Sequence, residues 1–245
     1  MNDLTIKDER LLDAIKNYKK LLEDRGYEVI YIGLYGSQNY NLDDEASDID
    51  CKAIIMPTLH DIIFRKPTSI TVEQPTGNID VKDLITYYDV IKKGNFSFIE
   101  AIDTEYYIGD EYIKELLKRF RPNKKSILGA MHEKRKALTH EYPSKTAEFE
   151  KWGFDPKQYH HIIRLFDLLK MGDNKSYLKY GECSAKVMIN IKRNKMNFRK
   201  KYVEQSSDMF IERAKTLISE DYKYTYENID NEIGAYIEER LLKGE

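Results

Sequence analysis

The chain has 245 residues, of which 41% are hydrophobic and 33% are charged, a composition that supports a buried core and excludes an intrinsically disordered chain. The 40 basic and 42 acidic residues leave a formal net charge of -2, so contact with nucleic acid would need a local basic patch. The two cysteines, Cys51 and Cys183, are far apart in sequence, which argues against a disulfide scaffold or a zinc site.

The amino-terminal segment lacks the basic and then apolar pattern of a signal peptide. No apolar run approaches the roughly 18–20 residues that span a bilayer. We therefore expect a cytoplasmic protein without membrane contact, in a reducing compartment.

The first hundred or so residues predict a mixed α/β unit. Apolar residues at helical spacing predict a helix over residues 8–25, which Gly26 ends. Runs of β-branched and aromatic residues then predict four strands and a following helix. The strands are expected at residues 27–35, 49–56, 68–73 and 79–82, and the helix at 83–93. This order lacks the regular alternation of a doubly wound fold.

From about residue 111 the apolar spacing is helical to the end of the chain. Helices are expected at residues 111–120, 124–140, 157–171, 184–196, 200–219 and 229–243. The predicted fold class is α+β, with a small mixed β-sheet domain flanked by helices at residues 1–110. An all-helical carboxy-terminal domain is expected to follow at residues 111–245.

Three aspartates are the candidate metal ligands. Asp48 and Asp50 stand at positions i and i+2 of a predicted strand, so their side chains project to one face. Two carboxylates aimed at one point repel each other, and a hard divalent cation relieves that repulsion. Asp80, on a later predicted strand, is the expected third carboxylate. Three carboxylates can hold two Mg²⁺ or Mn²⁺ ions about 3.5–4 Å apart, an arrangement that serves in-line displacement at phosphorus.

Gly36 and Ser37 directly follow the first predicted strand. Glycine lets the backbone approach a phosphate, and a serine hydroxyl and backbone amides can donate hydrogen bonds to it. A Gly-Ser pair or an Asp-X-Asp pair alone occurs by chance, but their joint order with a later aspartate is far more specific. Lys52 shares the strand face of Asp50, and either neutralisation of the acidic cluster or a phosphate contact is open to it.

The segment GSQNYNLDDEASDIDCKAI, at residues 36–54, carries a resemblance to a known family. It resembles the Gly-Ser and Asp-X-Asp signature of the DNA-polymerase-beta-type nucleotidyltransferases. Within that superfamily it is most similar to the RNA-repair-associated polymerase-beta-like predicted nucleotidyltransferases of bacteria and phages. The resemblance covers residues 28–105 most strongly and residues 125–170 more loosely.

The resemblance implies that Gly36 and Ser37 contact phosphate and that the three aspartates bind the metal ions. Asn41 departs from the pattern, in which a glycine follows the tyrosine. Asparagine adopts positive φ more readily than most residues, so we expect the turn to be kept.

Lys157, His161 and Arg164 lie at positions i, i+4 and i+7 of a predicted helix and share one face. Arginine can bind two oxygens at once and lysine supplies a compact charge, so this face suits a triphosphate. The alternative is a solvated basic face with a histidine packed in the core. Further basic stretches, at residues 132–136, 192–195 and 199–201, are candidates for a groove along an RNA backbone, although solvated helix faces are more common.

The sequence thus predicts transfer of a nucleoside monophosphate from an NTP to a hydroxyl acceptor by two-metal-ion catalysis, with Asp80 also able to accept the hydroxyl proton. The resemblance favours an RNA end as the acceptor, and a protein side chain or a small molecule is the alternative. Two hypotheses of other classes are a catalytically inactive nucleotide-binding regulatory module and a helical RNA-binding scaffold.

Overall fold

The computed structural model describes residues 6–44, 47–143, 146–171, 177–218 and 228–243. It is an α+β structure built around a five-stranded mixed sheet with strand order β3-β4-β2-β1-β5. The strands are β1 (Val29–Tyr35), β2 (Asp50–Ile55), β3 (Ser69–Gln74), β4 (Gly77–Asp83) and β5 (Tyr107–Gly109). Strands β2 and β4 pair in parallel, and the other neighbouring strands pair antiparallel.

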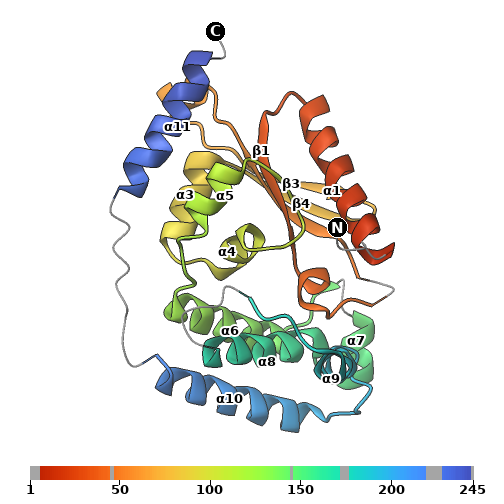
Figure 1. Ribbon diagram of the computed structural model, residues 1–245. Helices are drawn as coiled ribbons and strands as arrows, with labels where there is room; N and C mark the ends of the chain where they lie inside the picture. Colours follow the sequence, from red (N-terminus) through yellow and green to blue (C-terminus); the bar gives the residue numbers. More distant parts are fainter. Residues whose placement is uncertain (1–5, 45–46, 144–145, 172–176, 219–227, 244–245) are drawn as a thin grey trace.

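The two faces of the sheet bury different cores (Figure 1). Helix α1 (Ile6–Asp24) packs its apolar stripe on one face, against alternate residues of β2 such as Cys51 and Ala53. Four helices form the second core on the other face, where Ile54 points. These helices are α3 (Leu84–Lys92), α4 (Phe96–Ile102), α5 (Glu111–Leu117) and α11 (Ile229–Lys243).

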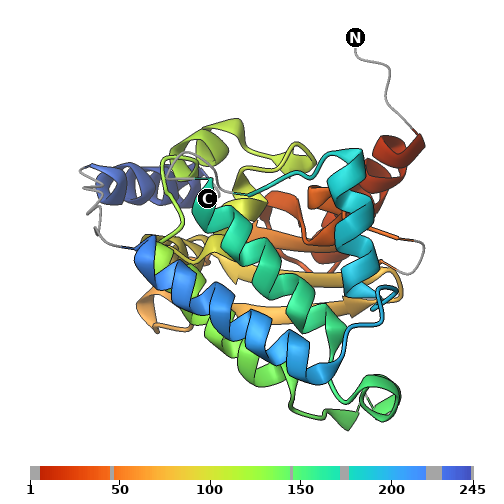
Figure 2. The same ribbon diagram turned by 90° about the horizontal axis from the view of Figure 1, so that it is seen from below.

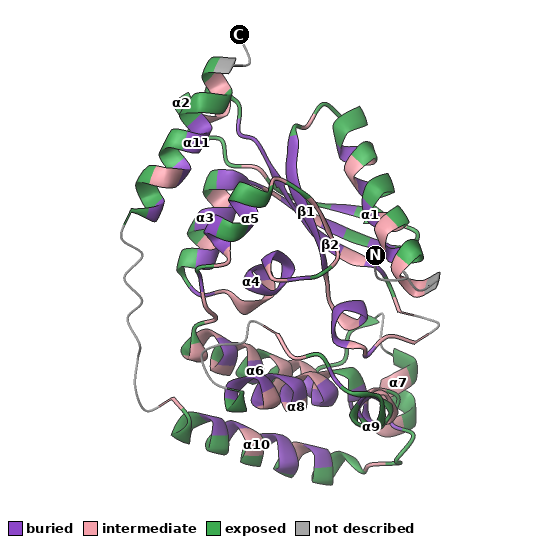
Figure 3. Cartoon of the chain, in the orientation of Figure 1, coloured by how far each residue is buried: buried purple, intermediate pink, exposed green. Residues whose placement is uncertain are grey.

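A helical half lies beyond one end of the sheet, where α6, α8 and α10 run side by side (Figure 2). Its helices are α6 (Lys124–Leu138), α7 (Thr146–Trp152), α8 (Pro156–Lys170), α9 (Glu182–Lys192) and α10 (Lys200–Thr216). Helix α8 is largely buried (Figure 3), because it contacts α6, α9 and α10. It is therefore the central helix of this half.

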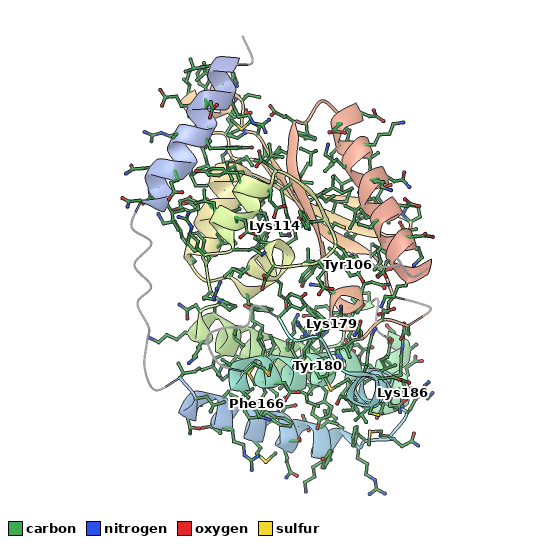
Figure 4. All side chains as sticks on the ribbon, in the orientation of Figure 1. Tyr106, Lys114, Phe166, Lys179, Tyr180 and Lys186 are labelled. Atoms are coloured by element: carbon green, nitrogen blue, oxygen red, sulfur yellow. The ribbon has the colours of Figure 1, made fainter. Side chains whose placement is uncertain are left out.

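The segment before α9 connects the helical half to the sheet half, which consists of the sheet and the helices on its two faces. Figure 4 labels Lys179 and Tyr180 at this junction. The Lys179 ammonium donates to Glu105 at 2.9 Å, and the backbone amide of Tyr180 donates to the carbonyl of Tyr40 at 2.9 Å. These contacts fix the loop after β1 against the helices.

The structure confirms the predicted α+β class and mixed sheet, with all four predicted strands close to their expected bounds. Five short elements were not predicted: the 3₁₀ helix η1 (Ser37–Tyr40), α2 (Leu59–Ile63), α4, β5 and α7. Helix α10 ends at Thr216, and residue 219, its predicted end, lies outside the described residues. Because α5 and α11 pack in the second core of the sheet, the helices after residue 110 do not share one core. The division into domains at that residue stays a prediction.

None of the helices within the described ranges combines the length and apolar character needed to cross a bilayer.

Gly77, at the start of β4, is expected to be essential for the approach of the β3–β4 hairpin to β2. Its φ is 148°, and a Cβ there would lie 2.2 Å from the carbonyl oxygen of Ile49. Gly77→Ala is therefore expected to lower the free energy of unfolding by about 1–3 kcal/mol, measured by urea denaturation. The matched control is Gly234→Ala in α11, where a Cβ meets nothing within 4 Å. This control is expected to raise stability by about 0.5–1 kcal/mol. Equal stability of the two variants would contradict the packing described.

Candidate active site

The turn after β1 has a backbone conformation that requires glycine at its first residue. Gly36 has φ 90° and ψ -154°, a conformation essentially restricted to glycine. A Cβ at this residue would lie 3.7 Å from Oδ2 of Asp50, so the turn passes directly beside that carboxylate. Ser37 begins η1, directly after this turn. Asn41 follows η1 with φ 62°, the positive value expected from the sequence.

The β3–β4 hairpin holds the acidic residues at the start of β2. The amide of Ile49 donates to the carbonyl of Thr76 at 2.7 Å. The amide of Asn78 donates to Oδ1 of Asp50 at 3.0 Å. The backbone at Ile49 and the carboxylate of Asp50 are thereby held against the hairpin.

Asp48 and Asp50 lie close enough to repel each other. Burial raises the pKa of Asp50, and the charge of Asp48 raises it further, while Lys157 and Lys52 act in the opposite direction. The Asp48 side chain is exposed to solvent. Oxygen ligands with this crowded negative charge fit a hard divalent cation, which would remove the repulsion.

Asp80 shares the sheet face of Asp50, but its carboxylate is already paired. It stands in register with Lys52 on the neighbouring parallel strand. The Lys52 ammonium donates to Asp80 Oδ2 at 2.9 Å, and the Lys82 ammonium lies 3.8 Å from Oδ1. Across the described ranges, no three His, Cys, Asp or Glu side chains gather where they could hold a metal ion. The expected convergence of all three aspartates on one metal centre is therefore not found.

Lys52 is buried between aromatic rings. Its ammonium lies 3.8 Å from the ring centroid of Phe98 and 4.6 Å from that of Tyr35. Burial lowers the pKa of Lys52, and the Asp80 carboxylate opposes that effect. The structure shows Lys52 paired with one acidic residue, Asp80, and its action on a phosphate stays a prediction.

The three residues predicted to share a face of α8 have different surroundings. Lys157 is exposed near the start of the helix, where its charge acts on Asp50. Arg164 is buried, with Nη1 3.0 Å from Oε1 of Glu100 and its guanidinium over the Tyr40 ring at 4.3 Å. Tyr40 also donates to Glu100. Arg164 therefore joins α8 to α4 and the loop after β1, rather than lying free on a face for a triphosphate.

His161 lines a cavity of about 390 Å³ between the sheet half and the helical half. Tyr35 lies at its sheet side, and helices α4, α6 and α8 supply the remaining wall. His161 Nδ1 and Arg164 Nε are buried there without a hydrogen-bond partner. Burial lowers the pKa of His161, and the charge of Arg164 lowers it further. The cavity therefore offers unpaired nitrogen atoms to a polar ligand.

Lys134 of α6 also lines this cavity. Its ammonium makes no hydrogen bond or ion pair with other residues that the structure describes. Burial lowers the pKa of Lys134, and the charges of Arg164 and Lys157 contribute in the same direction. The sequence placed Lys134 only in a general basic stretch, because nothing in its spacing pointed to the cavity. The helical side of the cavity therefore carries Lys134 and Arg164 together with one acidic residue, Glu133, and its cationic side chains suit an anion.

No protein-family model matches this chain, and no curated protein matches it. The functional assignment therefore depends on the residues of the site and their geometry.

Arg164 is expected to contribute to the free energy of unfolding, whether or not it also contacts a ligand. Arg164→Met leaves the carboxylate of Glu100 buried without its partner, which we expect to cost about 3–5 kcal/mol in urea denaturation. The double variant Arg164→Met/Glu100→Gln leaves no charge at either position and is expected to recover part of that loss. Unchanged stability of the single variant would show that the ion pair does not fasten α8 to α4.

Proposed function

We propose that this protein is a metal-dependent nucleotidyltransferase that moves a nucleoside monophosphate from an NTP to a hydroxyl acceptor and releases pyrophosphate. One observation carries the proposal: Asp50 lies beside the Gly36 turn, where the charge of Asp48 and the charge of Lys157 from the helical half both act on it. A site with two carboxylates, a close backbone turn and facing cations suits a metal-bound polyphosphate.

Asp48 and Asp50 would hold a Mg²⁺ or Mn²⁺ ion, because their carboxylates are hard oxygen ligands whose mutual repulsion a cation relieves. When bound, such an ion supplies positive charge to the triphosphate and lowers the pKa of a coordinated hydroxyl. Asp80 does not join this pair in the structure, since Lys52 holds its carboxylate.

The phosphates would lie between the sheet half and the helical half. The Gly36 backbone leaves room for them, and the hydroxyl of Ser37 at the start of η1 would donate a hydrogen bond. Lys134, Lys157 and His161 would face them from the helical side. Arg164 contributes through Glu100, by holding α8 in the position that presents these side chains. In this proposal the helical half is the nucleotide-binding partner of the sheet domain.

For the acceptor, we propose the terminal hydroxyl of an RNA rather than a long stretch of RNA backbone. The basic residues predicted to line a groove are partly neutralised within the protein. Arg135 pairs with Asp208 at 2.7 Å, and Arg193 pairs with Asp44 at 2.7 Å. These two arginines are therefore less available to a long polyanion. A protein side chain or small molecule remains the alternative acceptor in the test below.

Transfer is expected to depend on Asp48. Incubation with each labelled NTP, Mg²⁺ and total RNA is expected to label RNA, and Asp48→Asn is expected to reduce labelling by more than about 100-fold. The control is Asp24→Asn, an exposed aspartate at the end of α1, which should keep full activity. A labelled protein or small molecule in cell extract would change the acceptor. NTP binding without any turnover would instead support a regulatory module, and unchanged activity of Asp48→Asn would refute the metal site.

Lys134 is expected to bind the nucleotide. Lys134→Ala removes an ammonium from the cavity and is expected to raise the NTP concentration for half-maximal rate roughly tenfold, or about 1.4 kcal/mol. The matched control is Lys201→Ala on α10, an exposed lysine away from the cavity. Equal NTP requirements for both variants would place the nucleotide elsewhere.

A further inference from the structure

Lys52 occupies the part of the site where a second cation would be expected. Asp50 and Lys52 are at i and i+2 of β2 and so share one face of the sheet. Asp80 stands in register with Lys52 on β4. The Lys52 ammonium donates to Asp80 at 2.9 Å, and its charge also acts on Asp50. One fixed positive charge thus serves two carboxylates of the predicted metal triad.

The position of this ammonium is strongly constrained. Only 6% of the Lys52 side chain is exposed, and the rings of Phe98 and Tyr35 lie on its ammonium. Lysine over an aromatic ring is attracted by the ring quadrupole. Breaking the pair would leave the buried Lys52 ammonium without its carboxylate partner, which is strongly unfavourable. The Lys52 ammonium therefore has a fixed position in the site.

Asp80 is correspondingly unsuited to a metal ion. A divalent cation at its carboxylate would lie next to the ammonium of Lys52, and the Lys82 ammonium is 3.8 Å from the second oxygen. Like charges at these distances repel, and the repulsion is strongest where water is excluded. Asp48 and Asp50 carry no such direct ion pair among the described residues, so they stay available to a cation.

We propose that this site takes one divalent ion, held by Asp48 and Asp50, and that the Lys52 ammonium fixed on Asp80 supplies the second positive charge to the polyphosphate. This inference rests on the proposed function and refines it. Lys52 is then a built-in substitute for one ion of a two-ion site, and Asp80 is the residue that positions it.

The test is to count ions with Mn²⁺ and a non-hydrolysable NTP analogue. Mn²⁺ titration should give one ion per chain in the wild type, with the electron paramagnetic resonance spectrum of an isolated ion. Lys52→Met frees Asp80 and is expected to admit a second ion about 3.5–4 Å from the first, which gives an exchange-coupled spectrum. The matched control is Lys82→Met, whose ammonium is also bound to Ser69 at 2.6 Å, and it should keep one ion.

Two further variants separate the roles of the aspartates and do not depend on the folding of Lys52→Met. Asp80→Asn is expected to keep the single ion, and Asp48→Asn is expected to lose it. Two coupled ions in the wild type, or loss of the ion in Asp80→Asn, would overturn this inference while leaving the nucleotidyltransferase proposal intact. A single ion without any nucleotidyl transfer would refute the proposed function instead, and the ion count would stand.

Discussion

The site depends on holding two like charges close together at the beginning of β2. Nothing in the packing of the sheet requires Asp48 and Asp50 to be acidic, and their repulsion together with burial raises the pKa of Asp50. Backbone contacts maintain this arrangement: the hairpin approaches at Gly77, and the amide of Asn78 binds Asp50. This repulsion is the reason for the proposed cation at the pair.

The opposite charge lies across the junction of the two halves. Lys134, Lys157 and His161 come from α6 and α8, which are held against the sheet half by the buried pair of Arg164 and Glu100. A metal-bound triphosphate would place its negative phosphates against these helical side chains and its metal ion against the acidic pair. In the proposed function, nucleotide binding would therefore depend on the packing of the two halves.

Much of this arrangement follows from local sequence patterns. The strands, the Gly36 turn and the positive φ of Asn41 need only periodicity and backbone preferences. The pairing of Lys52 with Asp80 was not predicted, because it requires the parallel register of β2 and β4, which residues far apart in sequence determine. The burial of Arg164 was missed for a related reason, since its partner Glu100 lies on α4, a helix of seven residues too short to show a period.

The most direct test of the central claim is a crystal structure with Mn²⁺ and a non-hydrolysable NTP analogue, in which anomalous scattering locates the ion. We expect Mn²⁺ bonded to carboxylate oxygens of both Asp48 and Asp50, with the analogue's phosphates between Ser37 and the helical wall that carries Lys134. Mn²⁺ bound to other residues, or a triphosphate outside this junction, would contradict it.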